Sequence, residues 1–173
     1  MPEKTVILTG FMGSGKSTVG RVLAKRLACR FVDLDAEIVS ASGCSINELF
    51  AREGEPAFRE LESVHLKRIL ATGAGCVLAT GGGAVISDQN RAVMRSCAVI
   101  INLQVTLDQV LDRLKGCNNR PLLAGEDAAT RAAALMSARE QFYADADIRI
   151  DTDEKSVEDV SEEILCRLKG FSA

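Results

Sequence analysis

The stretch Thr5-Val-Ile-Leu-Thr-Gly10-Phe-Met-Gly13-Ser14-Gly15-Lys16-Ser17-Thr18 decides the fold of this chain. A short apolar run leads directly into the spacing Gly-x-x-x-x-Gly-Lys-Ser, the P-loop pattern of a loop that wraps a polyphosphate. Such a loop brings backbone N–H groups close to phosphate oxygens, and the three glycines remove side chains that would block this approach and permit positive φ. The alternative is a glycine-rich turn that only joins a strand to a helix, and the complete spacing disfavours it.

The end of the same stretch predicts how a nucleoside triphosphate is held. Lys16 supplies a point charge for the β- and γ-phosphates, Ser17 supplies a hydroxyl for Mg²⁺, and the helix that begins here offers its positive N-terminal end. The expected phosphate cradle consists of Gly13, Ser14, Gly15, Lys16, Ser17 and Thr18. These residues indicate the phosphate donor and leave the acceptor open.

Length and composition indicate one globular domain, residues 1–173. The chain is 47% hydrophobic and 26% charged, and its net charge of -3 argues against a nucleic acid or an anionic membrane surface as the main partner. The six cysteines include no C-x-x-C pair and no matching histidine, so they favour a reducing compartment over a zinc site or a disulfide framework. No apolar run approaches membrane-spanning length, and the cytoplasm is the expected location.

Hydrophobic periodicity predicts an alternation of strands and helices. Strands are expected at 4–9, 31–35, 76–80, 98–103 and 147–151, and helices at 16–28, 57–71, 88–95, 107–114, 127–144 and 156–169. Gly43, Gly54 and Pro56 are expected to divide the region between the second and third strands into short helices, one of which begins at a capping box of Ser45 and Glu48. This alternation predicts a three-layer α/β sandwich with a mainly parallel five-stranded sheet.

Two aspartates mark the end of the second predicted strand. Because strand side chains alternate, Asp33 and Asp35 are expected to point to the same side, at the sheet edge where ligands of this architecture bind. The alternative for Asp35 is an N-cap of the following helix. The strand 76–80 carries no acidic Walker B residue, so Asp33 is the available substitute for a carboxylate near magnesium.

Three further features are candidate ligand contacts. Gly81-Gly82-Gly83 lets the backbone approach a ligand closely, although a tight bend without a ligand is the alternative. Arg59, in the first turn of a predicted helix, opposes the helix dipole, which indicates either an anionic partner or an ion pair with Glu55 or Glu62. Residues 115–126 form a long loop, typical of a lid, in which Arg120 is held extended by the following proline; a solvated arginine is the alternative.

These features together predict a kinase that acts on a small molecule. Phosphoryl transfer requires charge neutralisation, an in-line acceptor and exclusion of water more than covalent chemistry. Arg59 and Arg139 suit a carboxylate on the acceptor, and Asp35 suits a hydroxyl whose proton must be oriented or accepted. The residues therefore favour a hydroxylated carboxylic acid as the acceptor.

Six motifs, taken together, resemble the shikimate kinases over about residues 4–168. They are Gly10-Phe-Met-Gly-Ser-Gly-Lys-Ser-Thr18, Phe31-Val-Asp-Leu-Asp35, Gly54-Glu-Pro-Ala-Phe-Arg59-Glu-Leu-Glu62, Ala79-Thr-Gly-Gly-Gly83, Arg120-Pro-Leu-Leu123 and Arg139-Glu-Gln-Phe-Tyr143. The resemblance implies transfer of the γ-phosphate of ATP to the 3-hydroxyl of shikimate, on the route to chorismate and aromatic amino acids. It also implies a nucleoside-monophosphate-kinase-like P-loop fold of strand order 2-3-1-4-5, with a lid at 115–126 and a shikimate-binding helical segment at about 35–62.

The resemblance also implies a role for each matching residue. The implied catalytic residues are Lys16, Asp35 and Arg120. The implied ATP contacts are the phosphate cradle together with Arg113, Arg120 and Lys155. The implied shikimate contacts are Asp35, Phe50, Phe58, Arg59, Gly81, Gly82, Gly83 and Arg139, and Glu62 is expected to orient Arg59. One Mg²⁺ per subunit is held by Ser17 and, through water, by Asp33. ATP and shikimate are the implied small-molecule partners, and a monomer without nucleic-acid or membrane partners is expected.

Two other functions fit parts of the sequence. The first is another small-metabolite kinase of the same fold, such as a gluconate kinase; the combination of Arg59, Arg139 and Asp35 favours a cyclic hydroxy acid instead. The second is a catalytically inactive kinase-like regulator, which is expected to have lost at least one of four principal residues. These residues are Lys16, Asp35, Arg59 and Arg139, and all four are present.

Overall fold

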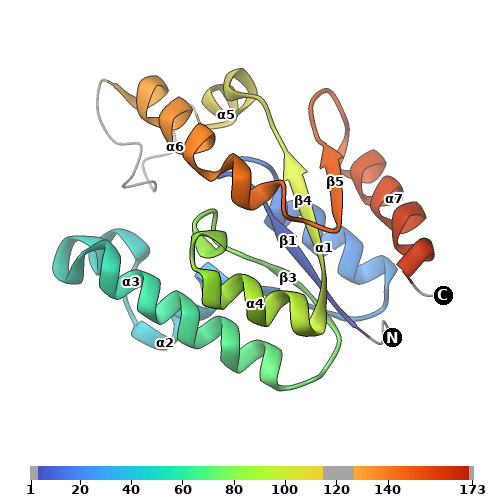
Figure 1. Cartoon of the computed structure of the whole chain (residues 1–173), viewed down its shortest axis with the longest axis horizontal. Helices are drawn as coiled ribbons and strands as arrows, with labels where there is room; N and C mark the ends of the chain where they lie inside the picture. The colour runs from blue at the N-terminus through green and yellow to red at the C-terminus, as the bar shows by residue number, and fades with distance from the viewer. Residues whose placement is uncertain (1–3, 115–126, 172–173) are drawn as a thin grey trace.

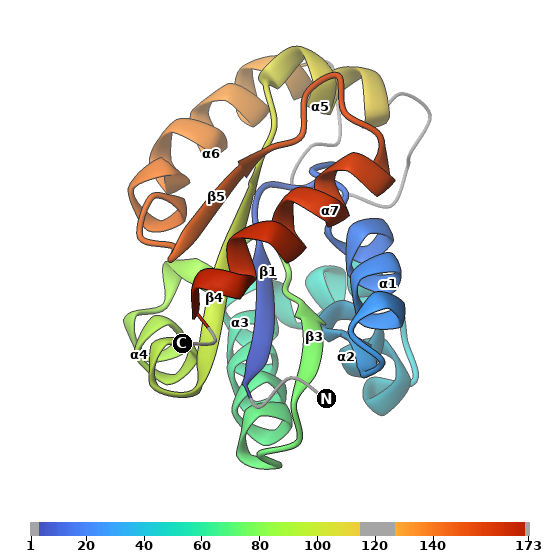
Figure 2. The ribbon, with the colours of Figure 1, turned by 90° about the vertical axis from the view of Figure 1, so that its right-hand side faces the viewer.

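The computed structural model describes residues 4–114 and 127–171, and its centre is a five-stranded parallel sheet (Figures 1 and 2). The strands are β1 (Thr5–Thr9), β2 (Arg30–Asp33), β3 (Cys76–Ala79), β4 (Ala98–Gln104) and β5 (Ile148–Asp151). They lie in the order β2-β3-β1-β4-β5, with Ile7 of β1 in register with Leu78 of β3 and Ile100 of β4. The predicted strand order is confirmed.

Helices cover both faces of the sheet, as predicted for a three-layer sandwich. They are α1 (Lys16–Arg26), α2 (Leu34–Ser42), α3 (Ile46–Ala71), α4 (Asp88–Cys97), α5 (Leu107–Leu114), α6 (Ala128–Tyr143) and α7 (Val157–Leu168), with 3₁₀ turns at η1 (Ala84–Ile86) and η3 (Lys169–Phe171). Helices α1 and α7 lie on one face, and α3, α4 and α6 lie on the other (Figures 1 and 2).

The core consists of two apolar layers separated by the sheet. Val6 and Leu8 of β1 pack in the layer that contains α1 and α7, whereas Ile7 packs in the layer that contains α3, α4 and α6. Successive strand residues face opposite sides, and both sides are covered, so β1 is apolar without alternation. This burial fixes the central strand from which the P-loop emerges.

The second strand is shorter than the sequence predicts. It ends at Asp33, whose Oδ1 accepts a hydrogen bond from the backbone N–H of Ala36 at 3.3 Å and so caps α2. Asp35 therefore lies in the first turn of α2, and the expectation that Asp33 and Asp35 belong to one strand and so point to the same side is wrong. The N-cap is Asp33, not Asp35, because its side chain satisfies a free N–H group of the helix and lets the chain turn without a loop.

The region between β2 and β3 is divided as predicted: α2 ends at Gly43, and the span α3 consists of two helices separated at Gly54. The capping box of Ser45 and Glu48 at the start of α3 is confirmed. Gly54 breaks the helical geometry with φ 81° and ψ 172°, and Pro56 follows at the start of the second half, where a missing N–H is tolerated. The kink places Arg59 in the first turns of that second half.

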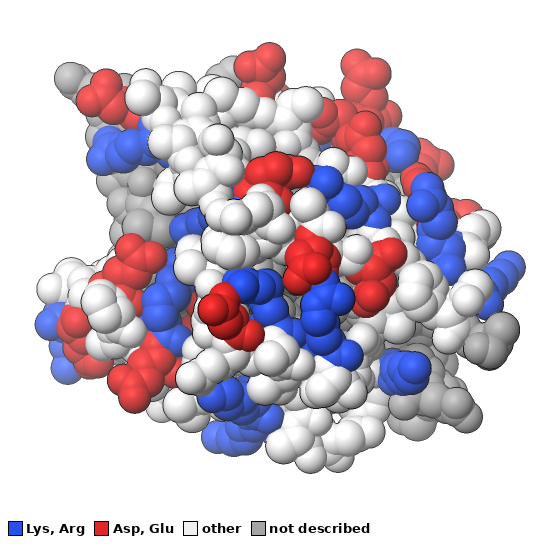
Figure 3. Space-filling view, viewed as in Figure 1, with Lys and Arg blue, Asp and Glu red and all other residues white. Residues whose placement is uncertain are grey.

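Charged side chains are mixed over the surface. On the face shown in Figure 3, Lys and Arg are interspersed with Asp and Glu, and no large patch carries a single sign. Ion pairs such as Arg26–Glu162 at 2.5 Å and Arg149–Glu140 at 2.6 Å account for part of this mixture. None of the helices in the described part of the chain combines the length and the apolar character that crossing a membrane requires.

Candidate functional site

The P-loop follows β1 and has the backbone conformation that its glycines were expected to permit. Gly10, Gly13 and Gly15 all have positive φ, at 141°, 79° and 88°. A Cβ on Gly10 would lie only 2.5 Å from the carbonyl oxygen of Leu103, so the close approach of β4 excludes any other residue there. The loop therefore has the open backbone that a polyphosphate cradle requires.

Lys16 lies within the curve of this loop. Its ammonium group donates hydrogen bonds to the carbonyl oxygens of Gly10 and Phe11 at 2.8 and 2.9 Å. The N-terminus of α1 is uncapped by any side chain, and its first turn holds no acidic residue. Backbone N–H groups at this helix end are thus available to an anion, and the nearby ammonium adds positive charge.

The hydroxyl of Ser17 meets the carboxylate predicted to serve the metal. Ser17 Oγ donates to Asp33 Oδ2 at 2.6 Å, which joins the start of α1 to the end of β2. In the described ranges, no cluster of three or more His, Cys, Asp or Glu side chains could hold a metal ion. A hydroxyl beside one carboxylate suits Mg²⁺, which usually takes few protein oxygens and completes its shell with phosphates and water.

The glycines after β3 leave room for functional side chains. A Cβ on Gly81 would lie 2.6 Å from Glu62 Oε1 and 2.9 Å from Asp35 Oδ1. A Cβ on Gly83 would lie 2.4 Å from the guanidinium atoms of Arg59. None of the three glycines has positive φ, so close approach, rather than an unusual backbone angle, explains them. The segment brings Asp35 and Arg59 to one short length of backbone.

Gly82 lies between the P-loop and α6. A Cβ at this position would lie 3.4 Å from the Met12 nitrogen and 3.7 Å from Arg139 Nη1. Arg139 is 3% exposed, and its guanidinium carbon lies 6.0 Å from the centroid of the Phe11 ring. The expected donor and acceptor contacts therefore meet at this glycine.

Arg59 forms both of the ion pairs considered from the sequence. Its Nε and Nη2 donate to Glu55 Oε1 at 3.2 and 3.0 Å, and its Nη1 donates to Glu62 Oε2 at 2.9 Å. Glu62 is 1% exposed, and burial raises its pKa although Arg59 opposes the rise. These pairs hold the guanidinium against Gly83.

Two aromatic rings lie beside this arginine. Phe50 and Phe58, from the two halves of kinked α3, have ring centroids 4.9 Å apart. The guanidinium carbon of Arg59 lies 5.4 Å from the Phe58 centroid. Arg59 also borders a hollow of about 370 Å³, which is lined by Glu62 and Gly83 together with residues of η1 and the start of α4. The structure thus combines an apolar wall with fixed charges.

The predicted adenine contacts lie apart from one another. Arg113 donates to the carbonyl oxygens of Gly13 at 3.0 Å and Thr152 at 3.3 Å, so it joins the P-loop to the segment after β5. Lys155 is instead paired with Glu163 of α7 at 2.8 Å. The predicted lid at 115–126 and its Arg120 lie outside the described residues.

Tyr143 is the residue of this site to which the sequence interpretation gave no role. Its hydroxyl donates to the carbonyl oxygen of Gly82 at 2.5 Å. The signal was available, because Tyr143 follows Arg139 by four positions on a helix and residues so spaced share a face.

Comparison with known proteins agrees with this geometry. The shikimate kinase family model matches residues 12–169. Shikimate kinases of Geobacter metallireducens and Geobacter sulfurreducens are 54% and 56% identical, covering 96% and 93% of this chain and 93% and 88% of the relatives. The structure of shikimate kinase from Acinetobacter baumannii in complex with shikimate superposes with a TM-score of 0.94 at 34% identity, covering 96% of this chain and 93% of that one. The chain therefore belongs to the shikimate kinase family.

Proposed function

We propose that this chain transfers the γ-phosphate of ATP to the 3-hydroxyl of shikimate, giving ADP and 3-phosphoshikimate. One observation supports this function more than any other: the backbone of residues 81–83 is in close contact with Asp35, Arg59 and Arg139, directly beside the P-loop. A site for a hydroxylated carboxylic acid thus adjoins a site for a polyphosphate. Membership of the shikimate kinase family supports the same acceptor.

The acceptor half of the site is the part that would bind shikimate: Asp35, Arg59, residues 81–83 and Arg139. Within it, Arg59 and Arg139 bind the carboxylate of shikimate. A guanidinium matches a carboxylate with two parallel hydrogen bonds, and Arg139 is almost fully buried, which strengthens charge pairing. Glu55 and Glu62 hold Arg59 in place, so little side-chain entropy is lost when the acid binds. Phe50 and Phe58 form the apolar side, and the backbone of Gly81 and Gly82 lines the ring.

Asp35 acts on the hydroxyl that attacks. Its Oδ1 is buried beside Gly81 and close to Glu62 Oε1, where water is scarce. A carboxylate in this position orients the hydroxyl proton and can accept it as the γ-phosphate transfers. The charges of Arg59 and Arg139 nearby keep the acceptor in register with this carboxylate.

The donor half is the part that would bind ATP, chiefly residues 10–18. In it, the P-loop backbone and Lys16 hold the phosphates. Ser17 holds one Mg²⁺ directly, and Asp33 holds the same ion through water. The ion neutralises charge on the β- and γ-phosphates when it is bound. Arg113 lies against the adenine side. The roles of Lys155 and Arg120, the monomeric state and the cytoplasmic location stay predictions from the sequence.

An ADP-release assay across acceptors tests this proposal. The purified chain, with ATP and Mg²⁺, is given shikimate, gluconate or a nucleoside monophosphate in parallel. We expect kcat/KM for shikimate to exceed the others by about 10³-fold or more, because buried charged groups left unpaired by a wrong acceptor are costly. A preference for gluconate would support the rival kinase, and ATP binding without turnover on any acceptor would support the inactive regulator.

A further inference from the structure

Tyr143 ends α6 in a buried position next to the glycine segment. It is 4% exposed, and its hydroxyl donates to the Gly82 carbonyl oxygen at 2.5 Å, which joins residues 61 positions apart. Burial raises the pKa of Tyr143 to about 12, although the charge of Arg139 opposes this. At neutral pH the hydroxyl therefore keeps its proton and can donate it to the carbonyl.

Arg139 and Tyr143 act on Gly82 from the same helix. Arg139 lies one turn before Tyr143, and its Nη1 is 3.7 Å from where a Cβ of Gly82 would be. The P-loop approaches the same point, where the Met12 nitrogen is 3.4 Å away. Gly82 thus lies close to both the P-loop backbone at Met12 and the guanidinium of Arg139. Its carbonyl oxygen accepts a hydrogen bond from Tyr143 of α6.

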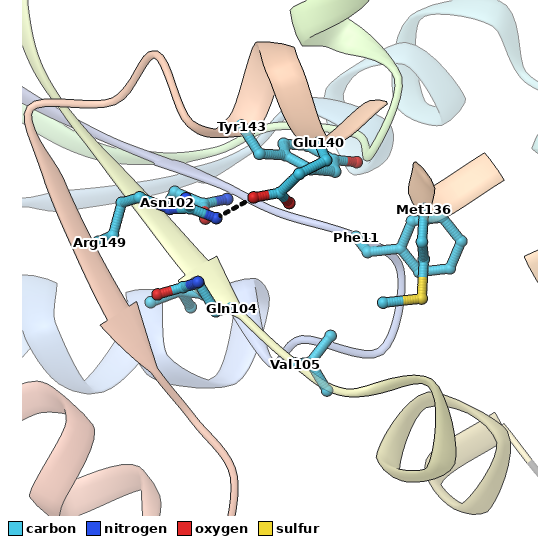
Figure 4. A pocket seen from close by; sticks show the side chains of 9 residues that line it. Phe11, Asn102, Gln104, Val105, Met136, Glu140, Tyr143 and Arg149 are labelled. Carbon is cyan, nitrogen blue, oxygen red and sulfur yellow. Dashed lines mark hydrogen bonds and ion pairs between the residues drawn. The ribbon is translucent and has the colours of Figure 1, made fainter. Parts of the chain in front are cut away.

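The tyrosine ring is packed in the core on one side and borders a hollow on the other. A hollow of about 80 Å³ lies beneath α6, lined by Tyr143, Phe11, Asn102 and Met136 among others (Figure 4). Asn102 Oδ1 is buried there and accepts no hydrogen bond from the described residues. The ring packs in the core layer on its other side, and its hydroxyl is placed by the hydrogen bond to the Gly82 carbonyl oxygen and by a hydrogen bond with the Arg139 side chain.

From this arrangement we propose that Tyr143 is a positioning residue of the acceptor site. Its hydroxyl fixes the Gly82 peptide at the distance from Arg139 that the shikimate carboxylate and ring require. This inference rests on the acceptor site proposed above. Tyr143 itself touches neither substrate; it acts through Gly82 and through the end of α6 that carries Arg139.

The variant Tyr143→Phe tests this role in the full chain. It keeps the ring and removes the hydrogen bonds of the hydroxyl to Gly82 and Arg139, so we expect KM for shikimate to rise about 3–10-fold while KM for ATP stays within about twofold. Ser161→Ala is the matched control, since it removes another buried hydrogen bond, from Ser161 Oγ to the Val157 carbonyl oxygen at 2.7 Å, on the distant helix α7. The control should change neither KM.

Tyrosine fluorescence gives a second readout that needs no variant. The chain has one tyrosine and no tryptophan, so its tyrosine emission reports Tyr143 alone. We expect shikimate to change this emission in the wild type, with a midpoint that matches its Kd from calorimetry. An emission that stays constant while shikimate binds would overturn the inference, even if Tyr143→Phe failed to fold.

Two further outcomes separate this inference from the function on which it rests. An Arg139→Ala variant with unchanged KM for shikimate would contradict the proposed acceptor site, and the role of Tyr143 would fall with it. If Arg139→Ala raises KM for shikimate, the acceptor site stands. The role of Tyr143 alone would then be overturned if Tyr143→Phe changed neither KM, or changed the KM values for shikimate and ATP equally. Wild-type protein that does not phosphorylate shikimate would contradict the proposed function itself.

Discussion

The donor and acceptor halves of the site are built in different ways. The proposed donor half consists mainly of one continuous segment, residues 10–18, whose backbone and one lysine we propose as the phosphate contacts. The acceptor half takes side chains from α2, α3 and α6 and sets them around the backbone that follows β3. A polyphosphate can be held by repeated N–H groups of one loop, whereas a small chiral acid needs several different groups at fixed positions.

Glycine serves a different purpose in each half. In the P-loop, Gly13 and Gly15 adopt positive φ, so these positions require glycine because of the backbone conformation. In the acceptor half, Gly81 and Gly83 have ordinary backbone angles but meet the side chains of Glu62, Asp35 and Arg59. The same residue type thus shapes a loop in one half and makes space in the other.

The variant Asp35→Asn should have the largest effect. Removing the carboxylate should lower kcat about 10²–10⁴-fold if Asp35 accepts the hydroxyl proton, while ATP affinity remains. Steady-state kinetics and ATP binding by calorimetry measure the two separately. Asp88→Asn is the control, because Asp88 also lies in the first turn of a helix but is 91% exposed. Near-normal turnover in Asp35→Asn would exclude the general-base role.

The variant Gly83→Ala should have a smaller effect, confined to the acceptor half. Its Cβ would fall 2.4 Å from the Arg59 guanidinium and displace it, so we expect KM for shikimate to rise about tenfold with KM for ATP unchanged. Gly170→Ala is the matched control, since nothing lies within 4 Å of its Cβ position. If both KM values rose together in Gly83→Ala, the separation of the two halves would be wrong.

The smallest effect concerns the pH dependence of stability. Burial raises the pKa of Glu62 above 4.5, so the folded state holds that proton more tightly than the unfolded state does. This contribution to stability is complete below the unfolded pKa and is lost as pH rises through the raised folded pKa. As pH rises from about 4 to about 7, the wild type should therefore lose stability relative to Glu62→Gln, which cannot titrate.

Urea unfolding at several pH values measures this difference. The same change at the exposed neighbour Glu60 provides the control. A difference between wild type and Glu62→Gln that stays constant with pH would contradict this prediction and show that Arg59 compensates fully for the burial of Glu62.

Local patterns predicted the elements better than their junctions. Periodicity located the strands and most helices because each buries a regular apolar face. It misplaced the end of β2, since whether Asp33 continues a strand or caps a helix depends on the free N–H of Ala36. It correctly divided the region at Gly54, because a residue with φ 81° and ψ 172° interrupts the helix locally, and Pro56 begins the next one.

The candidate site shows the same division. The P-loop glycines and the capping box of Ser45 and Glu48 could be predicted because the interactions involved join residues a few positions apart. The ion pairs of Arg59 were left as alternatives, since Glu55 and Glu62 are both within one helical turn of it and only the packed structure shows that it contacts both. Tyr143 received no role, because its partner Gly82 is 61 positions away.

The sequence by itself determined the donor half: the order of residues 10–18 dictates a loop, a helix start and a charge, because these depend on short-range backbone geometry. It also determined the layered architecture, through the periodicity of its apolar residues. Only the tertiary structure decided which side chains meet at residues 81–83. Asp35, Arg59, Arg139 and Tyr143 come together there because parallel strands align their carboxyl ends at one edge of the sheet, and helix packing then sets each distance.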